Sequence, residues 1–504
     1  MKRTNTPNVG GTRIQRNFSP VNVIILSLVS LAIVGCTLSD KNYEFGHDMD
    51  MYPSGVYNEK YKDYGENPFV NTTDEPISTF SVDADGGSYT NMRRFMHLGQ
   101  LPPVESVRIE EYLNFFTYDY KEPEKDENVS LESEIATCPW NDAHHLIRIG
   151  MKGITIPAEQ LPNSNYVFLI DVSGSMASPD KLGVLKTGFT TLADNLRDKD
   201  RIAIVTYAGS AGVLLESTNG SEKAKIKTAI KRLDAGGSTA GAEGIVTAYK
   251  IAEKNFIKDG NNRIILGTDG DFNVGISSTD ELVKLIEEKR ESGVYLTVLG
   301  VGDGNLNDQM MEQIANKGNG NYEYIDRASQ IQKVFTEEIT KFYTVAKDCK
   351  IQVTFSPTKV SSYRLIGYEN RKLNTEDFEN DSTDAGEIGA GQTITALYEV
   401  TLTPDLSAAP HLQPYAQFDF RYKKPHETES RLLEHKIMLL PKDMNDASEN
   451  TRFAASVAGF ALMMKNSEYR GTLSKGMVID LAKGALSFDP NGYRSEYVDL
   501  LKSR

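Results

Sequence analysis

The sequence predicts an α/β protein. We expect a doubly wound, mostly parallel sheet, flanked by a small N-terminal α+β domain and a C-terminal β-rich domain ending in helices. Residues 165–343 alternate short apolar runs with helical patterns, as successive βαβ units do. The run Val167–Ile170 is wholly apolar, which indicates a strand buried on both faces. Residues 344–504 begin instead with alternating, β-forming stretches separated by glycines and acids, which favours antiparallel strands.

The chain has 504 residues, which is too long for one ordinary domain. Its 39% hydrophobic and 25% charged content is typical of soluble globular proteins. The segments that we predict are an export signal at 1–35, a flexible, tyrosine-dotted tether at 36–66, an N-terminal domain at 67–150, a central domain at 165–343 and a C-terminal domain at 344–504.

The first 35 residues have the features of a bacterial export signal. A basic region precedes the apolar segment Val21–Val34, which is short for a membrane-spanning helix. Small or apolar residues come directly before Cys36, as in a lipobox, so we expect Cys36 to be lipidated and to become the new N-terminus. The alternative is a signal-anchor helix that stays uncut. Several acyl chains on one cysteine hold a protein firmly on a membrane.

This signal predicts a location in the bacterial cell envelope. Thr37, rather than an aspartate, follows Cys36, which favours the outer membrane or cell surface over the inner membrane. Removing the four basic residues before Cys36 changes the formal net charge from −15 to −19. A chain this acidic repels nucleic acid and anionic membrane surfaces, so we expect no nucleic-acid partner, and membrane attachment only through the lipid.

Two cysteines remain in the exported chain, Cys138 and Cys349. Export places them in an oxidising compartment, where a disulfide persists. They flank the central domain, whose ends are expected to lie close together. The two thiols are therefore candidates for a disulfide, and the alternative is two separate buried thiols. They lack the spacing of zinc ligands.

The elements of the central domain follow from the same patterns. The expected strands are 166–171, 202–208, 213–217, 263–268, 295–301 and 322–325. The expected helices are 181–197, 222–233, 240–254, 279–292, 308–316 and 330–342. Ligand sites in such sheets lie beyond the carboxyl ends of the strands.

The flanking domains have sparser signals. Before the central domain we expect one strand at 78–82 and two helices at 89–98 and 107–116. After it we expect strands at 350–355, 363–367, 393–401, 416–422 and 436–440, followed by a buried helix at 452–465 and another at 475–485. Residues 83–88 carry the spaced acids and glycines of a calcium loop, but no glutamate stands at the EF-hand distance. We interpret them as a turn that ends a strand.

The first strand of the central domain leads into the candidate site. Asp171 ends that strand, and Ser173 and Ser175 follow at alternate positions on the turn. Thr239 opens a later helix after two glycines, and Asp269 follows a third apolar strand. Three loops at strand ends thus supply two carboxylates and three hydroxyls. Oxygen ligands of this kind suit a hard cation such as Mg²⁺ rather than zinc.

This pattern resembles the von Willebrand factor A (VWA) domain, a Rossmann-like fold, and its metal-ion-dependent adhesion site (MIDAS). The family pattern is D-x-S-x-S, then a distant threonine, then a distant aspartate. It is complete here as Asp171, Ser173 and Ser175, then Thr239, then Asp269. The resemblance implies that these residues hold Mg²⁺, or Mn²⁺ or Ca²⁺, with one coordination position left open.

The resemblance extends beyond the central domain. Motifs in both flanking regions are similar to those of the YfbK-like VWA lipoproteins, in which characteristic N- and C-terminal regions surround a VWA domain. The motifs are Ser78–Asp83, Arg93–Phe95, Pro139–Asn141, Asn319–Tyr322, Tyr363–Arg371, Asp384–Gly391 and Ala396–Glu399.

The resemblance implies a membrane-anchored protein that captures an Asp or Glu carboxylate of a protein partner through the MIDAS cation. One alternative is an envelope scaffold, in which the flanking domains make the contacts and the metal only stiffens loops. A metal-dependent hydrolase is disfavoured, because two-metal hydrolases need further carboxylates or histidines. No histidine lies between residues 146 and 410. We therefore predict a binding protein and not an enzyme, with no catalytic residues.

Overall fold

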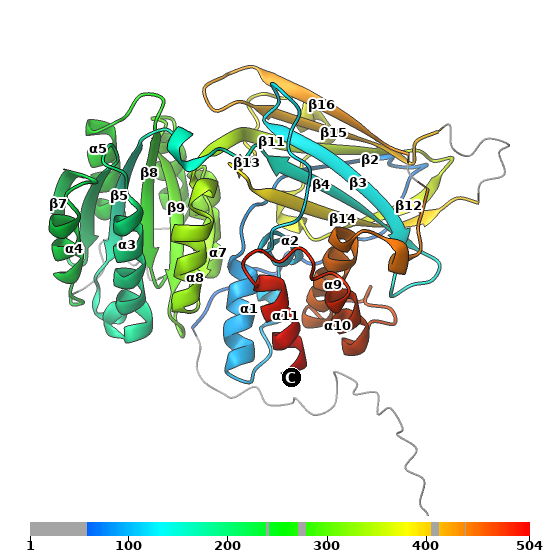
Figure 1. Ribbon diagram of the computed structural model, residues 1–504, viewed down its shortest axis with the longest axis horizontal. Helices are drawn as coiled ribbons and strands as arrows, with labels where there is room; N and C mark the ends of the chain where they lie inside the picture. The colour runs from blue at the N-terminus through cyan, green and yellow to red at the C-terminus, as the bar shows by residue number, and fades with distance from the viewer. Residues whose placement is uncertain (1–57, 238–240, 271–278, 405–412, 439, 504) are drawn as a thin grey trace, which may run out of the picture. The chain divides into compact units, whose positions relative to one another are not determined.

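The computed structural model describes residues 58–237, 241–270, 279–404, 413–438 and 440–503 (Figure 1). The predicted signal, Cys36 and Thr239 lie outside these ranges. All the described residues belong to one compact unit. They form one sheet of six strands and two sheets of five strands each.

The six-stranded sheet is the predicted doubly wound sheet. Its strand order is β10-β9-β8-β5-β6-β7, and every pairing is parallel except that of β6 with β7. Its strands are β5 (Ser164–Asp171), β6 (Arg201–Tyr207), β7 (Ala211–Asn219), β8 (Asn261–Thr268), β9 (Tyr295–Val301) and β10 (Tyr322–Ile325). The fold class predicted for this part of the chain is confirmed.

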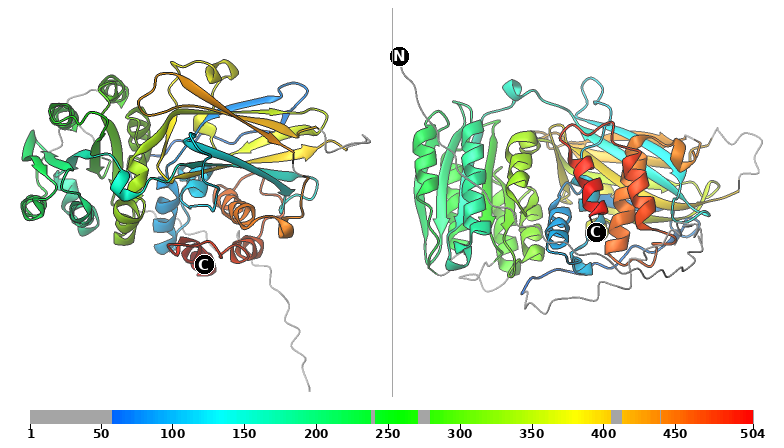
Figure 2. Two further views of the ribbon diagram at one scale, coloured as in Figure 1. Left: turned by 45° about the horizontal axis from the view of Figure 1, so that its top comes forward. Right: turned by 60° about the horizontal axis from the view of Figure 1, so that its bottom comes forward.

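Helices cover both faces of this sheet (Figures 1 and 2). Along β5, Phe168 and Ile170 pack in one apolar cluster, and Val167 and Leu169 pack in another. The first cluster includes residues of α3 (Val184–Asn195), α4 (Lys223–Lys231) and α8 (Ala328–Gln332). The second includes residues of α5 (Gly241–Lys254), α6 (Thr279–Arg290) and α7 (Asp308–Lys317). The apolar run of β5 thus reflects burial on both sides.

The other two sheets are antiparallel. One has the order β1-β12-β14-β4-β3, and the other has the order β13-β11-β15-β16 with β2 also paired to β11. Their strands are β1 (Val70–Asn71), β2 (Ile77–Ser81), β3 (Val129–Thr137), β4 (His145–Gly153), β11 (Thr344–Phe355), β12 (Val360–Ile366), β13 (Gly386–Gly389), β14 (Thr393–Leu402), β15 (Ala416–Lys423) and β16 (Ser430–Ile437). Strands from 67–150 and 344–504 therefore share both sheets, whereas the sequence suggested two separate flanking domains.

A helical layer packs beside these sheets (Figure 2). It consists of α1 (Gly87–His97), α2 (Ile109–Asn114), α9 (Glu449–Met464), α10 (Lys475–Lys483) and α11 (Tyr493–Lys502). Aromatic rings join them: Tyr89 stacks on Phe115 with centroids 4.2 Å apart, and Phe116 meets Phe453 edge-on at 4.9 Å. Helix α9 is buried along most of its length, as its apolar sequence predicts.

One predicted helix is interrupted. Instead of continuing over Gln330–Phe342, α8 ends at Gln332 and gives way to a π-helical turn, Lys333–Glu337, and a 3₁₀ turn, Ile339–Phe342. A buried ion pair between Lys333 and Glu338 stands at the break. A second π turn, Pro179–Gly183, delays the start of α3. Other short 3₁₀ turns lie at Val104–Ser106, Ala158–Gln160, Gly174–Ala177, Glu369–Arg371, Thr375–Phe378 and Met444–Asp446.

The candidate disulfide is not formed. Cys138 and Cys349 are both free and buried. They belong to different apolar clusters, because Cys138 follows β3 beside the helical layer whereas Cys349 lies within β11. Burial raises the pKa of both thiols, so both stay protonated at neutral pH.

Among the described helices, none combines the length and the apolar character needed to cross a membrane.

Candidate metal centre

The two aspartates of the predicted site lie at the ends of neighbouring strands. Strand β5 ends at Asp171, and its pairing with β8 places Ile170 beside Gly267. Asp171 and Asp269 therefore both follow the carboxyl edge of the sheet, where ligand sites form in such folds. Neither side chain is exposed: both residues have 0% relative accessibility.

The turn after β5 gathers the two serines. The backbone N–H of Ser173 donates to Oδ1 of Asp171 at 2.8 Å, which folds the turn back over the carboxylate. The hydroxyl oxygens of Ser173 and Ser175 lie 3.0 Å apart. Ser173 is buried and Ser175 is exposed, so this pair of hydroxyls leads from the buried carboxylate to the protein surface.

The segment that leads to Thr239 lies against the same turn. Gly174 N–H donates to the carbonyl of Gly237 at 3.1 Å, and Gly236 N–H donates to the carbonyl of Val172 at 2.7 Å. Two of the three predicted loops are thus joined by backbone hydrogen bonds. Thr239 itself lies outside the described residues, so its part in the site stays a prediction.

A lysine that sequence reasoning missed contacts Asp269. Lys181 Nζ donates to Asp269 Oδ2 at 3.0 Å and to Asn305 Oδ1 at 2.9 Å, and Lys181 is buried. Gly302, at φ +73°, makes room for it, because a Cβ there would lie 2.3 Å from Lys181 Cε. In the sequence, Lys181 is an ordinary lysine near a helix start, and nothing there indicates its partner.

The loop that carries Asn305 is held by the end of the predicted tether. Glu59 accepts a hydrogen bond from Gly304 N–H at 2.9 Å, and Lys60 N–H donates to the carbonyl of Leu306 at 2.8 Å. Glu59 also forms an ion pair with Arg94 of α1 at 2.8 Å. The stretch from residue 58 onward is thus anchored, although the sequence suggested a flexible tether up to residue 66.

The electrostatics of the site favour a bound cation. Burial raises the pKa of Asp171 to about 6, hydrogen bonds from Ser173 oppose this shift, and the nearby charge of Asp269 adds to it. Two buried carboxylates with neutral hydroxyls form an oxygen-only donor set, which fits a hard divalent ion such as Mg²⁺, Mn²⁺ or Ca²⁺. The described predicted ligands therefore suit the metal that the fold implies.

Comparisons with known proteins identify the three parts of the chain. Family models match at residues 55–148 (von Willebrand factor), 165–337 (von Willebrand factor type A domain) and 340–504 (Uncharacterized protein YfbK, C-terminal). The chain is 42% identical over 465 residues to the uncharacterized protein YfbK of Escherichia coli K12, covering 88% of this chain and 80% of that protein. It belongs to the YfbK family. The resemblance predicted from the sequence motifs is confirmed.

More distant relatives share shorter segments with this YfbK-family chain. An uncharacterized Synechocystis protein is 30% identical, covering 34% of this chain and 40% of its own length. Pig inter-alpha-trypsin inhibitor heavy chain H2 is 28% identical, covering 35% of this chain and 20% of its own length. A solved von Willebrand factor type A protein from Catenulispora acidiphila aligns over 77% of this chain and 91% of its own, with 18% identity and a TM-score of 0.43.

Proposed function

We propose that this YfbK-family protein is a lipid-anchored envelope protein that binds an exposed Asp or Glu side chain of a protein partner through a divalent cation. The metal ligands are Asp171, Ser173, Ser175, Thr239 and Asp269, and the preferred ion is Mg²⁺, with Mn²⁺ or Ca²⁺ as substitutes. The VWA domain supports an interaction module of the adhesion type.

The observation that carries the proposal is the pair of fully buried carboxylates at adjoining strand ends, next to the buried hydroxyl of Ser173 and the exposed Ser175. Lys181 compensates the charge of Asp269, but the charge of Asp171 is costly to bury unless a cation is bound there or the carboxylate is protonated. A divalent cation held there supplies an open coordination position for an incoming carboxylate.

Each residue has a distinct part in this binding. Asp171 and Asp269 supply negative charge from the buried side, and the serine hydroxyls supply neutral donors nearer the surface. Lys181 occupies one oxygen of Asp269 and adds a positive charge. The two carboxylates and the ammonium group together carry −1, so the site with a divalent ion carries +1. A net positive site favours an anionic group on the partner.

The attachment to the membrane is assigned to Cys36. The lipobox-like sequence before it supports lipidation, and residues 37–57 provide the link to the anchored stretch at Glu59. Thr37 directly after Cys36 supports an outer-membrane or surface position. Binding, rather than catalysis, is proposed because the VWA domain supports an interaction module. A two-metal hydrolase needs further carboxylates or histidines near the first ion, and no histidine lies between residues 146 and 410.

A scaffold role is the second candidate, and one observation favours it. Strands from before and after the central domain interleave in two shared sheets, which makes a broad rigid surface outside the metal centre. In that case the metal only stiffens the loops around Asp171, and partners bind elsewhere.

Matched peptides separate the two candidates. The full-length protein is tested by fluorescence anisotropy against peptide pairs that differ only by Asp versus Asn, or Glu versus Gln, at an exposed position. Under the proposal, the acidic member binds in Mg²⁺, loses binding in EDTA, and does not bind the Asp171→Ala variant. Equal binding of acidic and amide peptides, or binding that survives both EDTA and Asp171→Ala, contradicts the proposal and supports the scaffold.

A further inference from the structure

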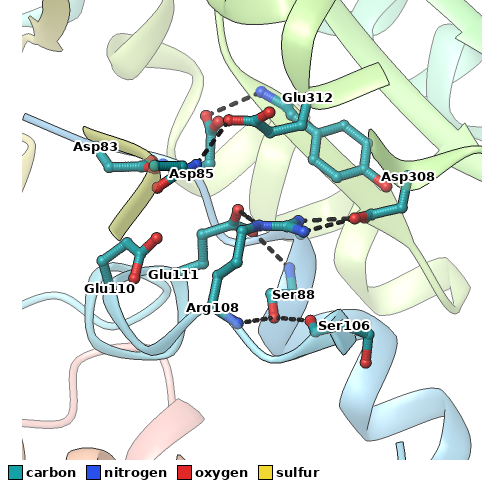
Figure 3. Close-up of polar contacts among 12 residues, drawn as sticks. Asp83, Asp85, Ser88, Ser106, Arg108, Glu110, Glu111, Asp308 and Glu312 are labelled. Atoms are coloured by element: carbon teal, nitrogen blue, oxygen red, sulfur yellow. Dashed lines mark hydrogen bonds and ion pairs between the residues drawn. The ribbon is translucent and has the colours of Figure 1, made fainter. Parts of the chain in front are cut away.

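A second group of carboxylates lies where the N-terminal region meets α7 and β10 (Figure 3). Asp83, Asp85 and Glu111 each offer an oxygen atom, and these atoms all lie within 4.8 Å of one another. All three residues are buried, with relative accessibilities of 2%, 2% and 0%. Among the described residues, no other group of three such side chains meets this condition. This cluster is separate from the Asp171 site.

Each carboxylate is oriented by the protein. Asp83 accepts from Asp85 N–H at 2.9 Å and from Arg371 Nε at 2.8 Å. Glu111 accepts from Ser88 N–H at 2.6 Å and forms an ion pair with Arg108. A carboxylate oxygen that accepts one hydrogen bond keeps a second lone pair, so these contacts leave room for a cation.

One oxygen in the cluster has no hydrogen bond. Asp85 uses Oδ1 to accept from Tyr322 N–H at 2.9 Å, whereas Oδ2 is buried and lacks a hydrogen-bond partner. The nearest cationic group in a described ion pair is Arg371 Nη2 at 3.7 Å, beyond hydrogen-bonding range. Because an unsatisfied buried carboxylate oxygen is costly, Asp85 Oδ2 is suited to binding a cation.

The charges around the cluster do not balance. Arg108 pairs with Glu111 and with Asp308 at 2.5 Å. Arg371 lies near Asp83, Asp85 and Glu312. Five carboxylates thus share two guanidinium groups, which leaves three negative charges uncompensated when every acid is ionised. Burial raises the pKa of Glu111 to about 7 and that of Asp85 well above its usual range.

A cavity adjoins the cluster on the side of Asp83 and Asp85. Asp83, Asp85, Glu312 and Arg371 line this cavity of about 400 Å³. Parts of four motifs shared with the YfbK family reach the same cavity, and none of them belongs to the Asp171 site: 78–83, 319–322, 363–371 and 384–391. The cavity therefore joins segments that the proposed function leaves unexplained.

We propose that Asp83, Asp85 and Glu111 bind a divalent cation of the calcium class. Three close carboxylates from separate segments suit Ca²⁺, which accepts six to eight oxygen ligands in irregular geometry, better than Mg²⁺ with its strict octahedron. The site is not an EF-hand, because Glu111 comes from α2 and not from the loop after Asp83 and Asp85. Tyr322 N–H of β10 donates to Asp85, and Asp308 of α7 pairs with Arg108, which also pairs with Glu111. A cation bound by Asp85 and Glu111 therefore fixes the N-terminal region to β10 and α7.

The test uses the full-length protein with Asp171→Ala, which removes the first site and makes failure of the two proposals distinguishable. Calcium is added during isothermal titration calorimetry and thermal unfolding. Asp85→Asn is the main variant, because an amide keeps the acceptor for Tyr322 N–H and removes the uncompensated charge. Glu111→Gln is the second variant, and the exposed Asp499→Asn is the control.

We expect the Asp171→Ala protein to bind one calcium ion and to unfold at a higher temperature with calcium. Adding Asp85→Asn or Glu111→Gln weakens calcium binding at least tenfold and abolishes the thermal shift, whereas adding Asp499→Asn changes neither. The proposal is overturned if Asp171→Ala binds no calcium, or if Asp85→Asn and Glu111→Gln bind it as tightly as their parent. In that event the cluster is kept neutral by protons.

Discussion

Lys181 Nζ lies 3.0 Å from Oδ2 of Asp269, and this ion pair places a buried ammonium group next to a predicted metal ligand. The lysine is held from its other side by Asn305, and Gly302 leaves the space that its stem occupies. The same positive charge that opposes a metal ion favours the carboxylate that would bind to that ion. The ammonium group of Lys181 therefore lowers the affinity for the metal ion and raises the affinity for the partner's carboxylate.

Replacing Lys181 with methionine, which keeps most of its shape, tests this relationship. We expect Lys181→Met to bind Mg²⁺ about tenfold or more tightly, because a nearby positive charge is removed from a poorly solvated site. We expect the same variant to bind the acidic peptide more weakly. Calorimetry and peptide anisotropy measure the two effects. Lys225→Met, at an exposed helix position, is the matched control. Changes of the same sign in both affinities contradict the account.

A substitution at Gly302 tests the same contact from its other side. In Gly302→Ala the added Cβ would lie 2.3 Å from Lys181 Cε, and the substitution strains a backbone with φ +73°. The lysine stem must move away, so we expect Gly302→Ala to shift Mg²⁺ and peptide affinities in the same directions as Lys181→Met. Gly304→Ala also strains a positive φ, but its added Cβ meets no atom within 4 Å, so it serves as the control for strain alone.

Metal affinity at the first site is expected to depend on pH. Burial raises the pKa of Asp171 to about 6, and only the ionised carboxylate binds a cation. The affinity for Mg²⁺ therefore stays nearly constant above pH 7 and falls about tenfold per pH unit below 6. Titrations at pH 5, 6, 7 and 8 measure this. A flat profile across that range contradicts the assignment of Asp171 as a ligand.

The raised pKa of Asp171 also determines how the stability of the metal-free protein changes with pH. The folded pKa of Asp171 lies above the unfolded value, so the metal-free protein binds more protons when folded and loses stability as pH rises from about 4 through 6. The loss is on the order of 3 kcal/mol. We therefore expect metal-free Asp171→Asn to have a higher free energy of unfolding than wild type at pH 7, measured by chemical denaturation. With saturating Mg²⁺ we expect wild type to be the more stable of the two.

Glu134 stabilises the folded protein in a way that depends on pH in the opposite direction to Asp171: its contribution is lost as the pH falls. Burial would raise its pKa, but hydrogen bonds from Lys442, Ser448 and Thr451 outweigh burial and lower the pKa to about 2. Because the folded pKa is depressed, this stability is present above about pH 4.5 and is lost as pH falls toward 2. These contacts hold the first turn of α9, whose N-cap is Ser448.

We expect Glu134→Gln to lower the free energy of unfolding at pH 7 by about 1–2 kcal/mol, after allowance for solvent screening. Denaturant titrations at pH 7, 4 and 3 measure the difference, which shrinks toward the acid end. Glu429→Gln changes an exposed glutamate and is the control. A difference that grows as the pH falls contradicts the assignment.

Membrane attachment is predicted to depend on one side chain. Cys36→Ala removes the only acceptor for the lipid in the lipobox-like sequence, so the protein should lose palmitate labelling and leave the membrane fraction. Ser39→Ala, three residues later, keeps the cysteine and is expected to behave as wild type. If Cys36→Ala stays in the membrane fraction, and neither wild type nor Cys36→Ala is labelled with palmitate, the result supports an uncut signal-anchor helix instead.

The central sheet was predictable because its signals are local. Strands β9 and β10 begin and end where the sequence indicates, since buried parallel strands are continuous apolar runs between amphipathic helices. Asp171 ends such a strand, and Ser173 and Asp269 come after one, so their place at one edge of the sheet follows from topology alone. The backbone hydrogen bonds of Gly236 and Gly237 then fix the loop that leads to Thr239 beside the turn after Asp171.

The missed features depend on distant partners. Strands β3 and β4 pair with each other, and β4 pairs with β14, more than 200 residues along the chain, which no local pattern reveals. Glu59 sits in a polar stretch without periodicity, yet it pairs with Arg94 and Gly304 N–H. Glu111, likewise, gives no sign in the sequence that it approaches Asp83. Side chains that act through long-range contacts need the folded structure to be found.

We propose above all that Asp171 and its neighbours hold a divalent cation. The most direct measurement is a calorimetric titration of Mg²⁺, with Mn²⁺ for comparison, into full-length wild type, Asp171→Ala and Asp85→Asn. We expect one saturable Mg²⁺ site in wild type and in Asp85→Asn, and we expect Asp171→Ala to lack it. Mg²⁺ binding that is unchanged by Asp171→Ala, or absent from wild type at millimolar concentration, would contradict the proposal.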